Sequence, residues 1–198
     1  MNNKAFIWGV IVGSIAVASL GHWGVFADSR DGETQVCISP KTVANYVHAV
    51  IQADRAVYTT EIVERMQLRG IVVASENWEQ RGTLPLPVQF LSESARLVAQ
   101  NHKGVRFRLI SLWPVNKRNA PSNEFERAGQ EDIRVHPDRP YTGIIEKAGK
   151  RYFQGVYADR AVSQACIGCH NSHPETPKAY FKLNDVMGGV VINIPLEE

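Results

Sequence analysis

The chain has 198 residues, of which 44% are hydrophobic and 21% are charged, and its formal net charge is +2. This length is enough for one ordinary globular domain and a leader segment. The balanced charge gives no reason to expect a nucleic acid partner, and three cysteines are too few for a disulfide framework.

Residues 1–27 have the pattern of an export segment. Lys4 precedes a run of apolar and small residues from Ala5 to Leu20, and Val25-Phe26-Ala27 fits a small-residue cleavage site. Residues 5–27 are also long enough to cross a bilayer, so the segment is either a cleaved signal peptide or a retained membrane anchor. In both cases we expect the rest of the chain in the periplasm or on the outer face of the inner membrane.

A polar linker at residues 28–37 follows, and we expect residues 38–196 to form one domain. Cys37 ends the linker. It is a candidate axial ligand or reactive thiol, although a free cysteine usually behaves as a small hydrophobic residue, and we favour that interpretation.

The first predicted helix runs from Pro40 to about Leu68, with Ser39 as its N-cap and Gly70 as its stop. Apolar residues recur along it at helical spacing and predict one buried stripe: Val43, Val47, Val50, Ile51, Val57, Tyr58 and Ile62. His48 lies on the flank of this stripe. It is either an ordinary surface residue or a candidate axial ligand of a metal cofactor.

The later segments predict a mixture of helices and strands. Leu84-Pro85-Leu86-Pro87 starts a second helix that ends before Gly104, and Ser122 is expected to cap a short helix from Glu124 to about Ile133. Alternating or β-rich runs predict strands at residues 105–113, 141–147, 150–157 and 186–194, with a hairpin at Ala148-Gly149. The predicted fold class is therefore α+β, with N-terminal helices and an antiparallel sheet.

The pentapeptide Cys166-Ile167-Gly168-Cys169-His170 has the C-x-x-C-H spacing of a c-type haem attachment sequence. Its two thiols would form thioether bonds to the haem, and the adjacent imidazole would bind the iron from the proximal side. One haem c, covalently bound, is the predicted cofactor. Because covalent attachment of haem requires export, the motif and the N-terminal segment support each other.

Two other interpretations of the motif fit less well. A structural zinc site takes four Cys or His ligands, usually from two knuckles, and the only spare thiol is the distant Cys37. A thioredoxin-like pair would lie between a strand and a helix near the start of the chain, whereas this motif lies near its end.

Several stretches beside the haem motif carry a resemblance to a known family: Ser111–Pro114, Arg118–Pro121, Glu124–Glu126, Tyr152-Phe153, Asn171, Pro177-Lys178, Lys182 and Asp185–Gly189. Together with the motif they resemble the bacterial single-haem c-type periplasmic sensor family. Its members have a PAS-like sheet, and it includes the cyanobacterial redox-sensor-like haem c domain of unknown function. The resemblance covers about residues 38–196.

The resemblance implies a PAS-like antiparallel sheet that carries a haem c, with Cys166 and Cys169 as the thioether positions and His170 as the proximal ligand. It also implies a cysteine as the other axial ligand, near Val88-Gln89-Phe90, and this chain has no thiol there. We therefore expect the sixth position to be open or to be filled by one of four residues, of which the first is preferred: His48, Met66, Met187 or Cys37.

Three classes of function are consistent with these features. The order of elements favours a haem-based redox or small-ligand sensor module that acts through a partner protein. The alternative is a periplasmic electron-transfer cytochrome c, because the sequence ends at Glu198 without an output domain. A haem peroxidase-like enzyme would need a distal histidine and arginine. His48 and Arg55 could supply them, but their spacing is common by chance, so we predict no enzyme and no catalytic residue.

Overall fold

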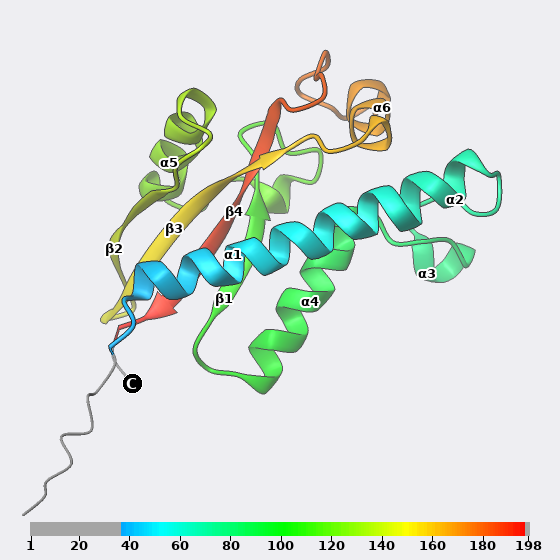
Figure 1. Cartoon of the computed structure of the whole chain (residues 1–198). Coiled ribbons are helices and arrows are strands. Elements are labelled where there is room, and N and C mark those ends of the chain that lie inside the picture. Colours follow the sequence, from blue (N-terminus) through cyan, green and yellow to red (C-terminus); the bar gives the residue numbers. More distant parts are fainter. Residues whose placement is uncertain (1–36, 197–198) are drawn as a thin grey trace, which may run out of the picture. The chain divides into compact units, whose positions relative to one another are not determined.

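The computed structural model describes residues 37–196, so the predicted export segment at residues 1–27 and the linker up to residue 36 lie outside the described residues. No helix in the described part is long and apolar enough to span a membrane. The elements, in chain order, are α1 (Pro40–Val57), the π-helical segment η1 (Tyr58–Glu64), α2 (Arg65–Leu68), α3 (Trp78–Arg81), α4 (Pro87–Asn101), β1 (Arg106–Ile110), the 3-10 turn η2 (Lys117–Asn119), α5 (Glu124–Val135), β2 (Tyr141–Lys147), β3 (Lys150–Arg160), α6 (Gln164–Ser172) and β4 (Val186–Pro195) (Figure 1).

The four strands form one antiparallel sheet in the order β1-β4-β3-β2. The hairpin between β2 and β3 turns at Ala148 and Gly149, where φ is +51° and +70°, as a tight two-residue hairpin turn requires. The last strand, β4, pairs between β1 and β3 and is therefore central. These observations confirm the predicted α+β fold with an antiparallel sheet.

Helices cover both faces of the sheet. On one face, Ala44 and Ile51 of α1 and Leu91 of α4 pack against Tyr157, Val190 and Ile192. On the other face, Ile133 of α5 packs against Ile110, Val156 and Val191. Successive residues of β3 and β4 thus point to opposite faces, which is the two-residue period of a strand buried on both sides. Figure 1 shows α1 crossing the sheet on the side away from α5.

The first long helix begins where predicted. Ser39 Oγ accepts a hydrogen bond from Thr42 N at 3.1 Å, and Pro40 occupies the first helical position. Gly70, with φ of +65°, follows its end. The predicted buried stripe was partly wrong, because Val50 and Val57 are 61% and 56% exposed. Ile51 of the predicted stripe is buried, whereas the other buried side chains of this helix, Ala44, Thr59 and Val63, were not part of it.

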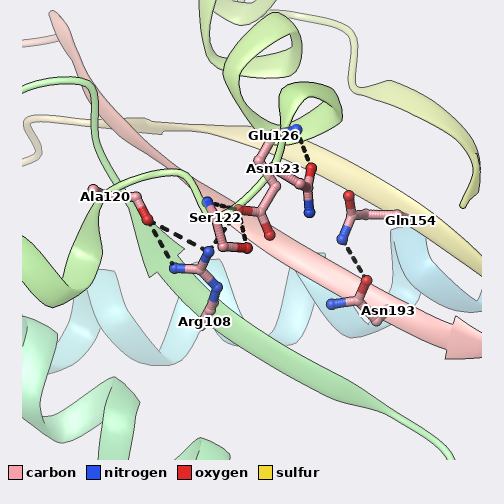
Figure 2. Close-up of polar contacts among 7 residues, drawn as sticks. All are labelled: Arg108, Ala120, Ser122, Asn123, Glu126, Gln154 and Asn193. Atoms are coloured by element: carbon pink, nitrogen blue, oxygen red, sulfur yellow. Dashed lines mark hydrogen bonds and ion pairs between the residues drawn. The ribbon is translucent and has the colours of Figure 1, made fainter. Parts of the chain in front are cut away.

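The start of α5 also differs from the prediction. Asn123, not Ser122, is the N-cap, and its Oδ1 accepts a hydrogen bond from Glu126 N at 2.9 Å. Ser122 has another partner: its backbone N and its hydroxyl both donate to Oε2 of Glu126. Arg108 of β1 completes this network around the buried Glu126 with an ion pair to the same carboxylate at 2.5 Å (Figure 2). The network ties the start of α5 to the first strand.

Candidate functional site

The C-x-x-C-H motif lies on a short helix, α6, which the chain fixes at its N-terminus. Ser163, in extended conformation, caps α6 by accepting a hydrogen bond from Ala165 N at 3.1 Å. Glu64 of η1 accepts a second bond from Gln164 N at 3.0 Å, although 100 residues separate the two in sequence. Besides following β3 in the chain, the motif is therefore held by a hydrogen bond to the first long helix.

The motif faces a cavity of about 640 Å³, a size typical of small-molecule and cofactor sites. Cys166, Cys169 and His170 all line it. The other walls come from the first long helix, the start of α4 and one end of the sheet, where β1 ends and β4 begins. Their apolar lining residues include Val63, Leu68, Leu86, Pro87, Val88, Leu109, Ile110, Trp113, Pro114, Val115 and Met187.

The helical wall of this cavity contains the π-helical segment, which the sequence did not predict. The cavity is lined by a series of residues at intervals of four along this wall: Arg55, Thr59, Val63 and Gln67. On a continuous α-helix such a series rotates away from one face, and the wider π turns, with i→i+5 bonds, offset that rotation. Thr59 Oγ1 donates to the Arg55 carbonyl at 2.7 Å and so competes with the regular helical pattern at this point.

A buried ion pair joins this wall to the sheet. Arg55 Nη1 lies 2.7 Å from Asp159 Oδ1, and both residues line the cavity. Burial raises the pKa of Asp159, while the charge of Arg55 opposes that rise. The Nε of Arg55 is buried without a hydrogen-bond partner. Asp159 was not singled out in the sequence, because nothing local indicates that a carboxylate near the end of a strand meets a helix a hundred residues earlier.

The motif residues have the ionisation behaviour of groups enclosed by protein. Burial lowers the pKa of His170, and the charges of Arg55 and His173 lower it further, so its imidazole is neutral and can act as a metal ligand. The Cys169 side chain is exposed and lines the cavity. Desolvation by the nearby walls nevertheless raises the pKa of this thiol, and Glu76 and Cys166 add to the rise.

The four candidates for a sixth ligand do not share one location. Met187 lines the cavity, whereas His48, Met66 and Cys37 are not among its lining residues. His48 instead stacks on Tyr157, with ring centroids 4.2 Å apart, and burial lowers its pKa to about 4. The structure therefore does not bring His48, the preferred candidate, together with the C-x-x-C-H motif. Its place on the first helix is two turns before Arg55.

Val88 does line the cavity. It belongs to the Val88–Phe90 stretch, where the resemblance implies a thiolate ligand. The next residues face elsewhere: Gln89 donates to the Glu76 carbonyl at 2.7 Å, and Phe90 stacks on Tyr58. An apolar valine thus lies on the cavity wall within the stretch where the resemblance implies a thiol.

The residues of this cavity fit a haem c. Two thiols and an imidazole lie on one wall, and a side chain at Gly168, between the thiols, would meet no atom within 4 Å. The remaining walls are largely apolar, as the body of a porphyrin requires. The Arg55 guanidinium also lines the cavity and can bind a propionate group of a haem.

A family model described as Tll0287-like matches residues 33–195. A solved structure described as that of the cyanobacterial heme-protein Tll0287 is 16% identical in sequence, with a TM-score of 0.49; the match covers 81% of this chain and 99% of that one. A search of curated proteins finds no match.

Proposed function

Because the chain belongs to the Tll0287-like family, we propose that it is an exported protein that carries one covalently bound haem c and serves as a redox or small-ligand sensor. The observation that carries this proposal is the joint placement of Cys166, Cys169 and His170 on one wall of a cavity of cofactor size. The family takes its name from Tll0287, which is described as a cyanobacterial heme-protein, and this agrees with the proposed cofactor.

In this proposal each motif residue has one role. Cys166 and Cys169 would hold the haem through thioether bonds, and His170 would bind its iron. The bound haem would supply an iron that changes oxidation state and accepts a small ligand. The chain's own contribution is to exclude water with apolar walls, to keep His170 neutral and to place the charges of Arg55 and Asp159 beside the group.

The physiological role we propose is signalling through a partner protein rather than catalysis. A buried ion pair that borders the haem cavity and joins the first helix to the sheet can respond to the charge of the iron. Residues 1–27 would direct the domain to the periplasm or to the outer face of the inner membrane.

Replacement of both thiols tests the cofactor. In Cys166→Ser/Cys169→Ser, we expect haem to be removed completely by acid–acetone extraction, whereas it stays with the wild-type protein. Cys37→Ser is the matched control, because Cys37 is exposed and is not among the residues lining the cavity; it should retain covalent haem. Covalent haem in the double variant, or none in the wild type, would refute the proposal.

A ligand challenge tests the sensor role. Binding of CO or NO to the reduced protein is expected for a ligand sensor. Refusal of both, together with electron exchange as fast as that of a carrier cytochrome, would assign the protein to electron transfer instead. Fractionation of cells that produce the full chain tests location: holo-protein found in the cytosol alone would contradict export.

A further inference from the structure

Asn171 directly follows the proposed axial ligand and binds both backbone groups of one distant residue. Its Oδ1 accepts a hydrogen bond from Phe181 N at 2.9 Å, and its Nδ2 donates to Phe181 O at 2.9 Å. The amide of Asn171 thus clamps Phe181 as a paired strand would. Because Asn171 lies on α6 beside His170, the clamp fixes Phe181 relative to the imidazole.

The clamped residue forms part of an aromatic wall against His170. Phe181 is only 4% exposed, and its ring meets the His170 ring edge-on, at a centroid distance of 6.1 Å and an angle of 87°. The Trp113 ring lies 5.9 Å from Phe181, also at a steep angle. The ammonium group of Lys178 lies 3.7 Å from the Trp113 ring centroid and 4.6 Å from that of Phe181, so it adds a positive charge to this wall.

The backbone before Phe181 is strained. Tyr180 has φ of +75°, a conformation that is rare for an aromatic residue. Its side chain is 89% exposed, so its own packing does not hold the backbone there. The two hydrogen bonds from Asn171 to the next residue do. The hydrogen bonds that offset the strain at Tyr180 therefore also fix the position of Phe181.

We propose that Asn171 is a positioning residue for His170: through Phe181 it holds the aromatic wall and the Lys178 charge beside the axial imidazole, and it thereby sets the reduction potential of the haem. This inference rests on the proposed haem. Apolar walls and nearby positive charge both disfavour the oxidised iron, which carries one more positive charge. If the clamp is lost, water reaches His170 and Lys178 moves away, and both changes lower the potential.

The test compares full-length variants that carry covalent haem, as judged by the pyridine haemochrome spectrum. Asn171→Ala removes the clamp, and Phe181→Leu removes the ring while leaving the backbone hydrogen bonds in place. We expect both to lower the midpoint potential and to change the electron paramagnetic resonance g values of the ferric protein. The double variant should be shifted no further than the larger single shift, because both substitutions disable the same contact.

Asn101→Ala is the matched control. Asn101 is an exposed asparagine of α4, donates through Nδ2 to Leu97 O at 3.0 Å and is not among the residues that line the cavity, so its replacement removes a helical hydrogen bond without touching Phe181. Its potential and g values should equal those of the wild type. Lys178→Gln should lower the potential while the g values stay the same.

The outcome that would overturn the inference is specific. If Asn171→Ala lowers resistance to urea but leaves the potential and g values at the wild-type values, then Asn171 only closes the loop. Should Asn171→Ala not fold, Phe181→Leu and Lys178→Gln decide alone, and unchanged potentials in both would refute the inference. A wild-type protein without haem would instead refute the proposed cofactor, so the two failures are distinguishable.

Discussion

Two arginine–carboxylate pairs, Arg108–Glu126 and Arg55–Asp159, connect helices to the sheet in this protein, but their surroundings differ. The Arg108 guanidinium binds Glu126 and lies within 3.5 Å of the Ala120 carbonyl. The same carboxylate oxygen accepts from the backbone and hydroxyl of Ser122 (Figure 2). Neither residue of this pair lines the cavity.

The Arg55–Asp159 pair is less completely satisfied. Arg55 Nε has no partner, and burial raises the pKa of Asp159 despite the adjacent guanidinium. Both residues line the cavity. The comparison indicates that the first pair stabilises the fold. The second pair keeps charges beside a cofactor site and is expected to contribute less to stability.

The largest effect is expected when the satisfied pair is broken. Glu126→Ala leaves the Arg108 guanidinium and the Ser122 donors without their shared acceptor, and the Glu126 side chain is only 3% exposed. We expect a loss of about 3 kcal/mol in the free energy of unfolding, measured by urea denaturation.

Glu131→Ala is the control for Glu126→Ala, because Glu131 pairs with Arg134 on the exposed side of the same helix. Its loss should be about 0.5 kcal/mol or less. Equal losses in the two variants would show that the network around Glu126 contributes no more to stability than a surface ion pair.

A smaller and pH-dependent effect is expected at the cavity. Asp159→Asn should cost about 1–2 kcal/mol near pH 4. The pKa of Asp159 in the folded protein is raised above its ordinary value of 3.8. As the pH rises, this carboxyl group therefore loses its proton in the unfolded chain before it does so in the folded protein. This difference lowers the stability of the wild type but not that of the variant, which lacks the carboxyl group. The advantage of the wild type should therefore shrink from pH 3.8 upward in urea titrations. A growing advantage would show that Arg55 lowers this pKa overall.

The smallest effect is expected at His48, which lies on α1 outside the cavity. His48→Phe retains a ring against Tyr157 but cannot be protonated. Because burial lowers the pKa of His48 from 6.5 to about 4, the unfolded chain is protonated first as the pH falls, so the wild type should lose about 1 kcal/mol of stability between about pH 7 and pH 5.5, and the variant should not. His136→Phe, at an exposed site, is the control.

The haem spectrum of His48→Phe sharpens the comparison further. Because His48 does not line the cavity, the visible spectrum should equal that of the wild type. A change from low spin to high spin in this variant would instead make His48 an iron ligand.

Much of this protein could be predicted from local sequence alone. Strand periods, the Ala148-Gly149 turn, the Ser39-Pro40 start and the Gly70 stop each depend on residues within a few positions of one another. The α+β class, the long first helix, α4, α5 and the four strands were therefore predicted, whereas the short helices α3 and α6 were not. The C-x-x-C-H motif is local as well, and its spacing singled out three residues that line the cavity.

Only the tertiary structure decided which residues meet that motif. The pairing of Arg55 with Asp159 joins residues more than a hundred positions apart, and the clamp of Asn171 on Phe181 closes a loop that no local pattern predicts. The face of α1 was mispredicted for the same reason. Its apolar residues surround more of the helix than the sheet covers, so packing selected Ala44 and Ile51 over Val50 and Val57, and it left His48 against Tyr157 instead of in the cavity.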